Sequence, residues 1–248
     1  MTPEEKQEEI KRLTKQIQDN ADKNIPKEAP KRNVEKVGQL FFGPYVALCK
    51  VHESLVRGLM NRGEKLESGT ANTTLAGHLA DQRRYTREDK EWYIKEFKPY
   101  VDWYVKGALE WTGHKLEQET SFTLMDLWIN YMKAHEYNPE HYHGGQLSWV
   151  IFCKTPDVKQ EQKSFEGTSP PPGTLVFHYG EPQHPKWADH TFNYEPQEYH
   201  MWMFPAQLRH QVIPFHTEGT RISVSGNLYF NGPGMPDDIS DNPNGFNG

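Results

Sequence analysis

Three histidines and one arginine have the residue types and spacing of a metal site beside an acid-binding site. His141 and His143 stand two residues apart, and His210 follows much later in the chain. A close His-x-His pair with one distant histidine is how a small β-barrel brings imidazole donors together from separate strands. Arg221 would add a planar guanidinium that suits a carboxylate. The pattern therefore predicts a metal ion next to an organic acid.

The residues around the close pair favour a cavity over a surface loop. Side chains two apart on an extended strand face the same side, so both imidazoles can enter one cavity. Gly144 and Gly145, which follow directly, let the backbone turn there. Two alternatives stay open. Nine of the twelve histidines lie between His135 and His216, which fits a histidine-rich surface, and His210 could be a capped histidine of the core.

The strand expected over residues 220–230 has one polar and one apolar side. The polar side consists of Arg221, Ser223, Ser225 and Asn227, and the apolar side of Ile222 and Val224. Facing into a barrel, four polar residues would need a polar ligand to satisfy them. Facing solvent, they would need none. The sequence alone does not decide which side faces inward.

Composition sets the class of protein. The 248 residues can bury a sizeable core, and 12% aromatic content fits a β-rich globular domain better than a disordered chain. The net charge of −6 disfavours nucleic acid as a partner. There is no apolar run long enough for a membrane span and no secretory signal at the start. Cys49 and Cys153 are expected to be packing residues in a reduced cytoplasm.

Three regions are expected along the chain. Residues 1–36 read as a helix and a linker, in which the apolar stripe Ile10, Leu13 and Ile17 leaves a homodimer open. Residues 37–230 read as one domain with a helical N-terminal half. Residues 231–248, rich in glycine, proline and acidic residues, read as a mobile tail.

Within the domain, the period of the apolar residues changes from that of helices to that of strands. A strand is expected over 39–46, then a helix over 46–62 that ends at Gly63, and a longer helix that Thr86 caps together with Asp89 and that ends at Gly113. Six strands follow, over 122–132, 147–154, 173–179, 199–204, 210–215 and 220–230. The fold class predicted is α+β, a double-sheet jelly roll with the N-terminal helices packed on one sheet.

At this point the order of the motifs resembles a known family, the 2-oxoglutarate/Fe(II) oxygenases of bacteria and marine phages. The segments that carry the resemblance are 128–130 (WIN), 137–145 (YNPEHYHGG), 147–152 (LSWVIF), 173–177 (GTLVF), 204–210 and 221–227 (RISVSGN). Residues 75–78 (LAGH) are similar to the phage-type members. The resemblance implies a double-stranded β-helix, which is a cupin-like jelly roll, with iron at the mouth of the barrel.

The resemblance also implies roles for single residues. His141 and His210 would be iron ligands, Arg221 would bind the distal carboxylate of 2-oxoglutarate, and Ser223 and Asn130 would contact the same co-substrate. His143 departs from the superfamily, where an acidic residue is usual, so that the ligand set would become His141, His143 and His210. The departure leaves two alternatives, in which His143 lies behind the ligands or a carboxylate such as Glu136 or Glu140 binds the metal.

The reading favoured is an Fe(II)- and 2-oxoglutarate-dependent dioxygenase that uses O2 to hydroxylate an organic or peptidyl substrate, with His141, His210 and Arg221 as the residues that carry catalysis. The rivals are a cupin-like metal-binding module without 2-oxoglutarate turnover, and a structural phage or host-interaction protein that has lost turnover. The sequence does not name the substrate. Residues 179–199 form an insertion that reads as a substrate lid or as a plain surface loop.

Overall fold

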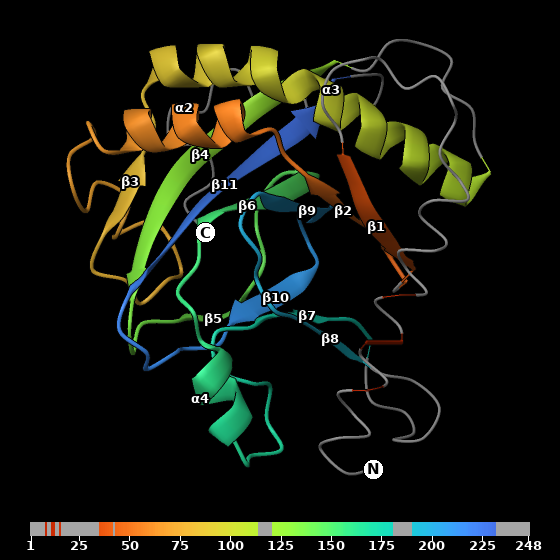
Figure 1. Ribbon diagram of the computed structural model, residues 1–248. Coiled ribbons are helices and arrows are strands. Elements are labelled where there is room, and N and C mark those ends of the chain that lie inside the picture. Colours follow the sequence, from red (N-terminus) through yellow and green to blue (C-terminus); the bar gives the residue numbers. More distant parts are fainter. Residues whose placement is uncertain are drawn as a thin grey trace.

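The computed structural model describes residues 8, 11, 12, 15, 35–41, 43–113, 121–180 and 190–231 (Figure 1). Residues 8, 11, 12 and 15 are helical and exposed. The apolar stripe expected in the N-terminal helix, and nearly all of the expected linker and C-terminal tail, lie outside the described residues. No helix in the described part of the chain is long and apolar enough to cross a membrane.

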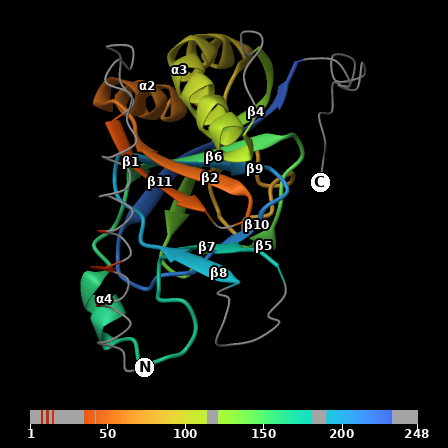
Figure 2. The same ribbon diagram turned by 90° about the vertical axis from the view of Figure 1, so that its right-hand side faces the viewer.

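The strands form two antiparallel sheets that face each other (Figures 1 and 2). In spatial order, the large sheet consists of β1 (Glu35–Phe41), β2 (Tyr45–Lys50), β9 (His200–Pro205), β6 (Leu147–Lys154), β11 (Thr220–Phe230), β4 (Phe122–Lys133) and β3 (Gln82–Arg84). The small sheet consists of β5 (Asn138–His141), β10 (Arg209–Val212), β7 (Leu175–His178) and β8 (Thr191–Tyr194).

From β4 to β11 the chain winds between the two sheets. The strands β4, β6, β9 and β11 lie in the large sheet, and β5, β7, β8 and β10 lie in the small one. Their spatial orders, β4-β11-β6-β9 and β5-β10-β7-β8, are those of a double-stranded β-helix. The predicted jelly roll is therefore confirmed.

Two helices cover the outer face of the large sheet, α2 (Glu53–Gly63) and α3 (Arg87–Thr112). The short α4 (Lys159–Ser164) lies on the opposite side of the molecule, at the bottom of Figure 1. Buried residues of both helices pack on the outward side chains of the sheet. Phe97 of α3, for example, lies with its ring centroid 4.3 Å from that of Trp149 on β6. A second core, with Phe177, Trp202 and Phe204, fills the space between the sheets.

The ends of α3 are where the sequence places them. Thr86 accepts from the backbone N–H of Asp89, and the Asp89 carboxylate accepts from the backbone N–H of Thr86. Gly113 ends the helix with a φ of 74°, a conformation that favours glycine. This part of the prediction is confirmed.

The helix predicted over 46–62 is wrong in its first part. Tyr45–Lys50 is the strand β2, which pairs with both β1 and β9. A strand that is buried on both faces has a continuous apolar run without a period of two, so it cannot be told from a buried helix by pattern. The helix α2 begins only at Glu53, after the N-cap His52.

Three short strands were not predicted: β3, β5 and β8, with three or four residues each. Such strands are too short for alternation to be visible. β5 even contains Pro139, which is tolerated because β5 is at the edge of the small sheet.

Replacing Thr86 tests whether the cap stabilises the start of α3. We expect Thr86→Ala to lower the free energy of unfolding by about 1 kcal/mol, because one backbone donor at the start of α3 loses its acceptor. Urea denaturation of both proteins measures the difference. The control is Thr112→Ala at the other, exposed end of α3, where a change below about 0.5 kcal/mol is expected. Equal losses in both variants would contradict a specific role of the cap.

Candidate metal and co-substrate site

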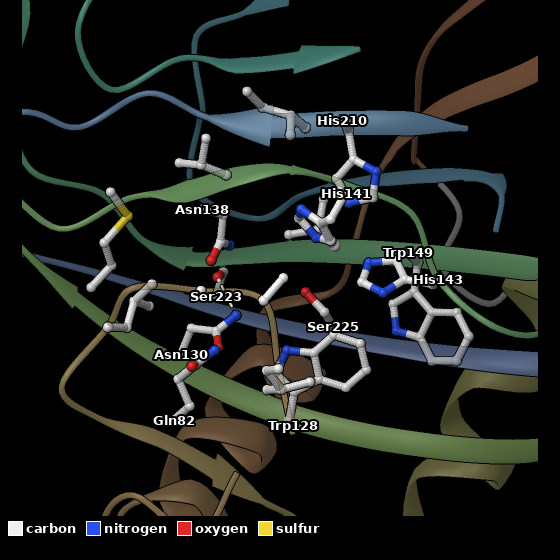
Figure 3. Close-up of a pocket in the computed structure, with 18 of the residues that line it drawn as sticks. Gln82, Trp128, Asn130, Asn138, His141, His143, Trp149, His210, Ser223 and Ser225 are labelled. Carbon is white, nitrogen blue, oxygen red and sulfur yellow. Dashed lines mark hydrogen bonds between the residues drawn. The ribbon is translucent and has the colours of Figure 1, made fainter. Parts of the chain in front are cut away.

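The three predicted histidines meet at one end of a cavity between the sheets (Figure 3). His141 is the last residue of β5 and pairs in register with His210 on β10. His143 lies two residues beyond β5, and its backbone N–H donates to Ala206 O at 2.8 Å. The ring centroids are 4.3 to 5.0 Å apart, and one ring nitrogen from each histidine lies within 4.8 Å of the others.

Backbone carbonyls orient two of these rings. The Nδ1 atom of His141 lies 2.7 Å from Pro139 O, and that of His210 lies 2.9 Å from Leu208 O. A carbonyl oxygen can only accept, so Nδ1 carries the hydrogen in both rings. The Nε2 lone pair of each ring is then available to a metal, which is the usual way that histidine ligands are held.

Burial keeps all three imidazoles neutral. It lowers the pKa of His141 and His210 below the ordinary value. For His143, burial and the neighbouring His141 lower the pKa to about 3. A divalent metal requires neutral imidazoles, because a protonated nitrogen has no lone pair to give. The cluster is thus ready to bind a cation at neutral pH.

Neither of the alternative carboxylates belongs to this cluster. Glu136 accepts from the backbone N–H groups of Ala80 and Lys133, at 2.8 and 2.7 Å. Glu140 pairs with Arg209 at 2.9 Å. Among the residues that the structure describes, the one group of potential ligands for a metal is His141, His143 and His210.

Arg221 is a buried cation in the same cavity. Its side chain donates to Gly173 O and lies over the ring of Phe215, with 5.5 Å from Cζ to the ring centroid. The residue is 3% exposed, and burial lowers the pKa of its guanidinium to about 10. Within the described part of the chain, Nε and Nη1 have no hydrogen-bond partner. A buried positive charge is costly unless an anion pairs with it, so this position favours binding of an anion.

The structure decides which face of β11 points inward. Arg221, Ser223 and Ser225 line the cavity, whereas Ile222 and Val224 pack under the helices. Both faces are buried, which is why alternation alone left the question open. Asn227, the fourth residue of the polar face, is also buried, but it accepts from Ser148 Oγ at 2.7 Å and does not line the cavity.

Asn130 lines the cavity as well. So do two neighbouring residues that the sequence pattern does not indicate, Gln82 and Asn138. Asn130 accepts a hydrogen bond from Gln82 on β3 at 3.0 Å. Asn138 reaches the cavity from β5, and Gly77 lets it approach, since a Cβ there would lie 2.2 Å from Asn138 Oδ1. The one signal for this region was the segment 75–78.

The other histidines of the described part of the chain do not line the cavity. His135 and His216 are exposed, and their ring centroids are 4.6 Å apart. Of the insertion 179–199, residues 181–189 lie outside the described part, and none of its described residues lines the cavity. A lid therefore stays a prediction.

Comparison with known proteins adds the family. Residues 126–227, which span β4 to β11 and hold the three histidines and Arg221, match the family described as "Putative 2OG-Fe(II) oxygenase". This part of the chain is similar to the 2OG-Fe(II) oxygenases. The match indicates a dioxygenase that depends on Fe(II) and 2-oxoglutarate and uses O2 as second co-substrate.

Solved structures are similar in fold at low sequence identity, and no curated protein sequence matches the chain. A 2OG-Fe(II) oxygenase family oxidoreductase from Burkholderia pseudomallei has 12% identity and a TM-score of 0.48, covering 74% of this chain and 83% of its own. A Pseudomonas putida prolyl-4-hydroxylase has 13% and 0.47, covering 77% and 95%. HygX from Streptomyces hygroscopicus, solved with nickel and 2-oxoglutarate, has 9% and 0.42, covering 74% and 82%.

The buried charge of Arg221 has a consequence for stability. We expect Arg221→Met to leave the free energy of unfolding of the ligand-free protein unchanged or to raise it by up to about 2 kcal/mol, because an apolar side chain of similar length replaces a buried charge. Urea denaturation without metal or 2-oxoglutarate measures this.

The control for that experiment is Arg83→Met. Arg83 donates to the Asp81 carboxylate at 2.6 and 2.9 Å, so its loss leaves a partly buried carboxylate without its partner. We expect the free energy of unfolding to fall by about 1 to 3 kcal/mol. A loss of the same size in Arg221→Met would show that the ligand-free protein does satisfy the charge of Arg221.

Proposed function

We propose that His141, His143 and His210 hold Fe(II), and that Arg221, Ser223 and Asn130 bind 2-oxoglutarate. The observation that carries the proposal is a buried arginine, without a carboxylate partner among the described residues, in the same cavity as three neutral imidazoles. The donor set fits the metal, because imidazole is a good ligand of Fe(II). When bound, iron would supply the oxidative chemistry that couples decarboxylation of 2-oxoglutarate to hydroxylation of a substrate.

The protein's part is orientation and electrostatics. Pro139 O and Leu208 O hold the rings of His141 and His210, so the two Nε2 atoms would need little reorganisation when metal binds. Gly173 O and Phe215 hold the guanidinium of Arg221. Its planar fork matches a carboxylate at two points, which fixes both the position and the direction of the co-substrate.

Three neutral ligands leave the metal with its full double charge. With Arg221, the cavity would hold three positive charges, of which the two carboxylates of 2-oxoglutarate neutralise two. Both positive centres lie in a buried setting where charges interact strongly. The three-histidine set therefore favours a dianionic co-substrate over a neutral one.

The apolar walls would keep water from this chemistry. Leu175, Phe204 and Val212 line the cavity beside the histidines, and Trp128 lies with its ring centroid 5.5 Å from that of His143. Exclusion of water strengthens every electrostatic contact inside and protects reactive species from side reactions.

The broader features predicted from the sequence are also part of the proposal. They are a single oxygenase domain over residues 37–230, a cytoplasmic setting, no membrane or nucleic-acid partner, and an N-terminal stripe that leaves a homodimer open. The net charge of −6 supports the absence of nucleic acid. The substrate proposed is organic or peptidyl.

Removing one histidine tests the metal site. We expect His210→Ala to lose at least 100-fold in Fe(II) affinity, because one of three ligands and its fixed ring are lost, whereas the exposed His216→Ala keeps the wild-type affinity. Anaerobic titration with Fe(II), followed by metal analysis after desalting, measures the loss. Full retention of iron in His210→Ala would refute the assignment, and the same result in His143→Ala would place His143 behind the ligands.

Anaerobic addition of 2-oxoglutarate to the Fe(II) protein tests the co-substrate site. We expect a visible metal-to-ligand charge-transfer band in the wild type. In Arg221→Lys, the concentration of 2-oxoglutarate that gives half of the band should rise by about tenfold or more, because lysine cannot form the two-point contact. Arg209→Lys, outside the cavity, serves as the control.

Two outcomes of that titration would count against the proposal. If iron binds but no band appears, the protein is better described as a cupin-like metal-binding module. If the band forms in Arg221→Lys as readily as in the wild type, Arg221 does not bind the co-substrate.

A further inference from the structure

A row of three polar side chains crosses the large sheet at the cavity. Gln82 on β3 stands opposite Asn130 on β4, and Asn130 stands opposite Ser223 on β11. All three are buried and line the cavity. In Figure 3 they lie together on the side of the cavity away from His143. The row thus reaches from the edge strand β3 to the strand that carries Arg221.

The hydrogen bonds of this row run in one direction. Gln82 Nε2 donates to Asn130 Oδ1 at 3.0 Å, and Asn130 Nδ2 donates to Ser223 Oγ at 3.5 Å. Asn130 turns its oxygen to Gln82 and its NH2 group to Ser223, and the opposite order would need both amides to turn over together. Ser223 then accepts with its oxygen, and its own hydrogen is left to donate.

The direction matters because the ligand expected beside Ser223 is an anion. A hydroxyl that donates its hydrogen to a carboxylate stabilises it, whereas a hydroxyl that presents a lone pair repels it. If the row ran the other way, Ser223 would donate to Asn130 and turn its lone pairs to the ligand. Those lone pairs would repel the carboxylate that Arg221, two residues away on the same face of β11, is expected to bind, and the binding would be weaker.

We propose that Gln82 is a positioning residue for the co-substrate. By holding Asn130 in one orientation, Gln82 directs the hydroxyl hydrogen of Ser223 to the distal carboxylate of 2-oxoglutarate, without touching the co-substrate itself. This inference rests on the proposed role of Arg221 and Ser223. It assigns a function to a residue that lies outside the segment matched by the oxygenase family, residues 126–227.

The affinity for 2-oxoglutarate tests the proposal. In Gln82→Leu, we expect the dissociation constant for 2-oxoglutarate to rise about five- to tenfold, with unchanged Fe(II) affinity, because Asn130 can then turn and take the Ser223 hydrogen. The measurements are two anaerobic titrations, of the metal-free protein with Fe(II) and of the Fe(II) protein with 2-oxoglutarate. In Gln82→Glu, the carboxylate can only accept, so it draws the NH2 group of Asn130 and reverses the row; a larger rise is expected.

A double-mutant cycle separates positioning from a general loss of structure. If Gln82 acts through Ser223, the variant Gln82→Leu/Ser223→Ala binds 2-oxoglutarate as Ser223→Ala does, so the two effects do not add. The matched control is Ser148→Ala, which removes another buried hydrogen bond of the large sheet, that to Asn227, outside the cavity. It should lower stability and leave the dissociation constant unchanged.

Each result is decisive. Wild-type affinity in Gln82→Leu and Gln82→Glu, full additivity in the cycle, or an equal rise in Ser148→Ala would overturn the positioning role. Failure of the proposed function would look different, because the wild type itself would then bind iron without forming a complex with 2-oxoglutarate.

Discussion

The burial of β11 on both of its faces is the constraint on which the rest of the structure depends. The strand pairs with β4 on one side and with β6 on the other. Its outward residues pack under α2 and α3, and its inward residues form the cavity wall. A shift of one residue in register would exchange the two sets, turning Ile222 and Val224 to the cavity and Arg221 to the apolar core. Gly226 helps to hold the register, since a Cβ there would lie 2.3 Å from the ring of Trp149 and 2.7 Å from Asp126 O.

The site itself works against stability. An arginine with two unpartnered nitrogens and three neutral imidazoles turned toward one another are costly in a packed interior. The large sheet and its helices offset this cost through extensive aromatic and aliphatic packing. The small sheet contributes His141 and His210 of the candidate metal site from short strands, and the pairing of these two residues places them on one ladder. Most of the stabilising packing therefore lies on the large sheet, and the candidate site lies between the two sheets.

Sequence reasoning located long elements well and short ones poorly. The strands β6 and β11 and the capped helix α3 were found because each is long enough to show its period or its cap. The strand β2 was taken for helix because it is buried on both faces, and β3, β5 and β8 have too few residues for any pattern.

The candidate site shows the same limit. His141, His143, His210 and Arg221 could be named from their types and spacing, and the structure brings them to one cavity. Gln82 could not be named, because its position opposite Asn130 depends on the pairing of a three-residue strand. Its hydrogen bond to Asn130 depends on that pairing, which is not visible in the chain before it folds. Residues that act on a ligand only by orienting a neighbouring side chain are therefore the hardest functional residues to predict from a sequence.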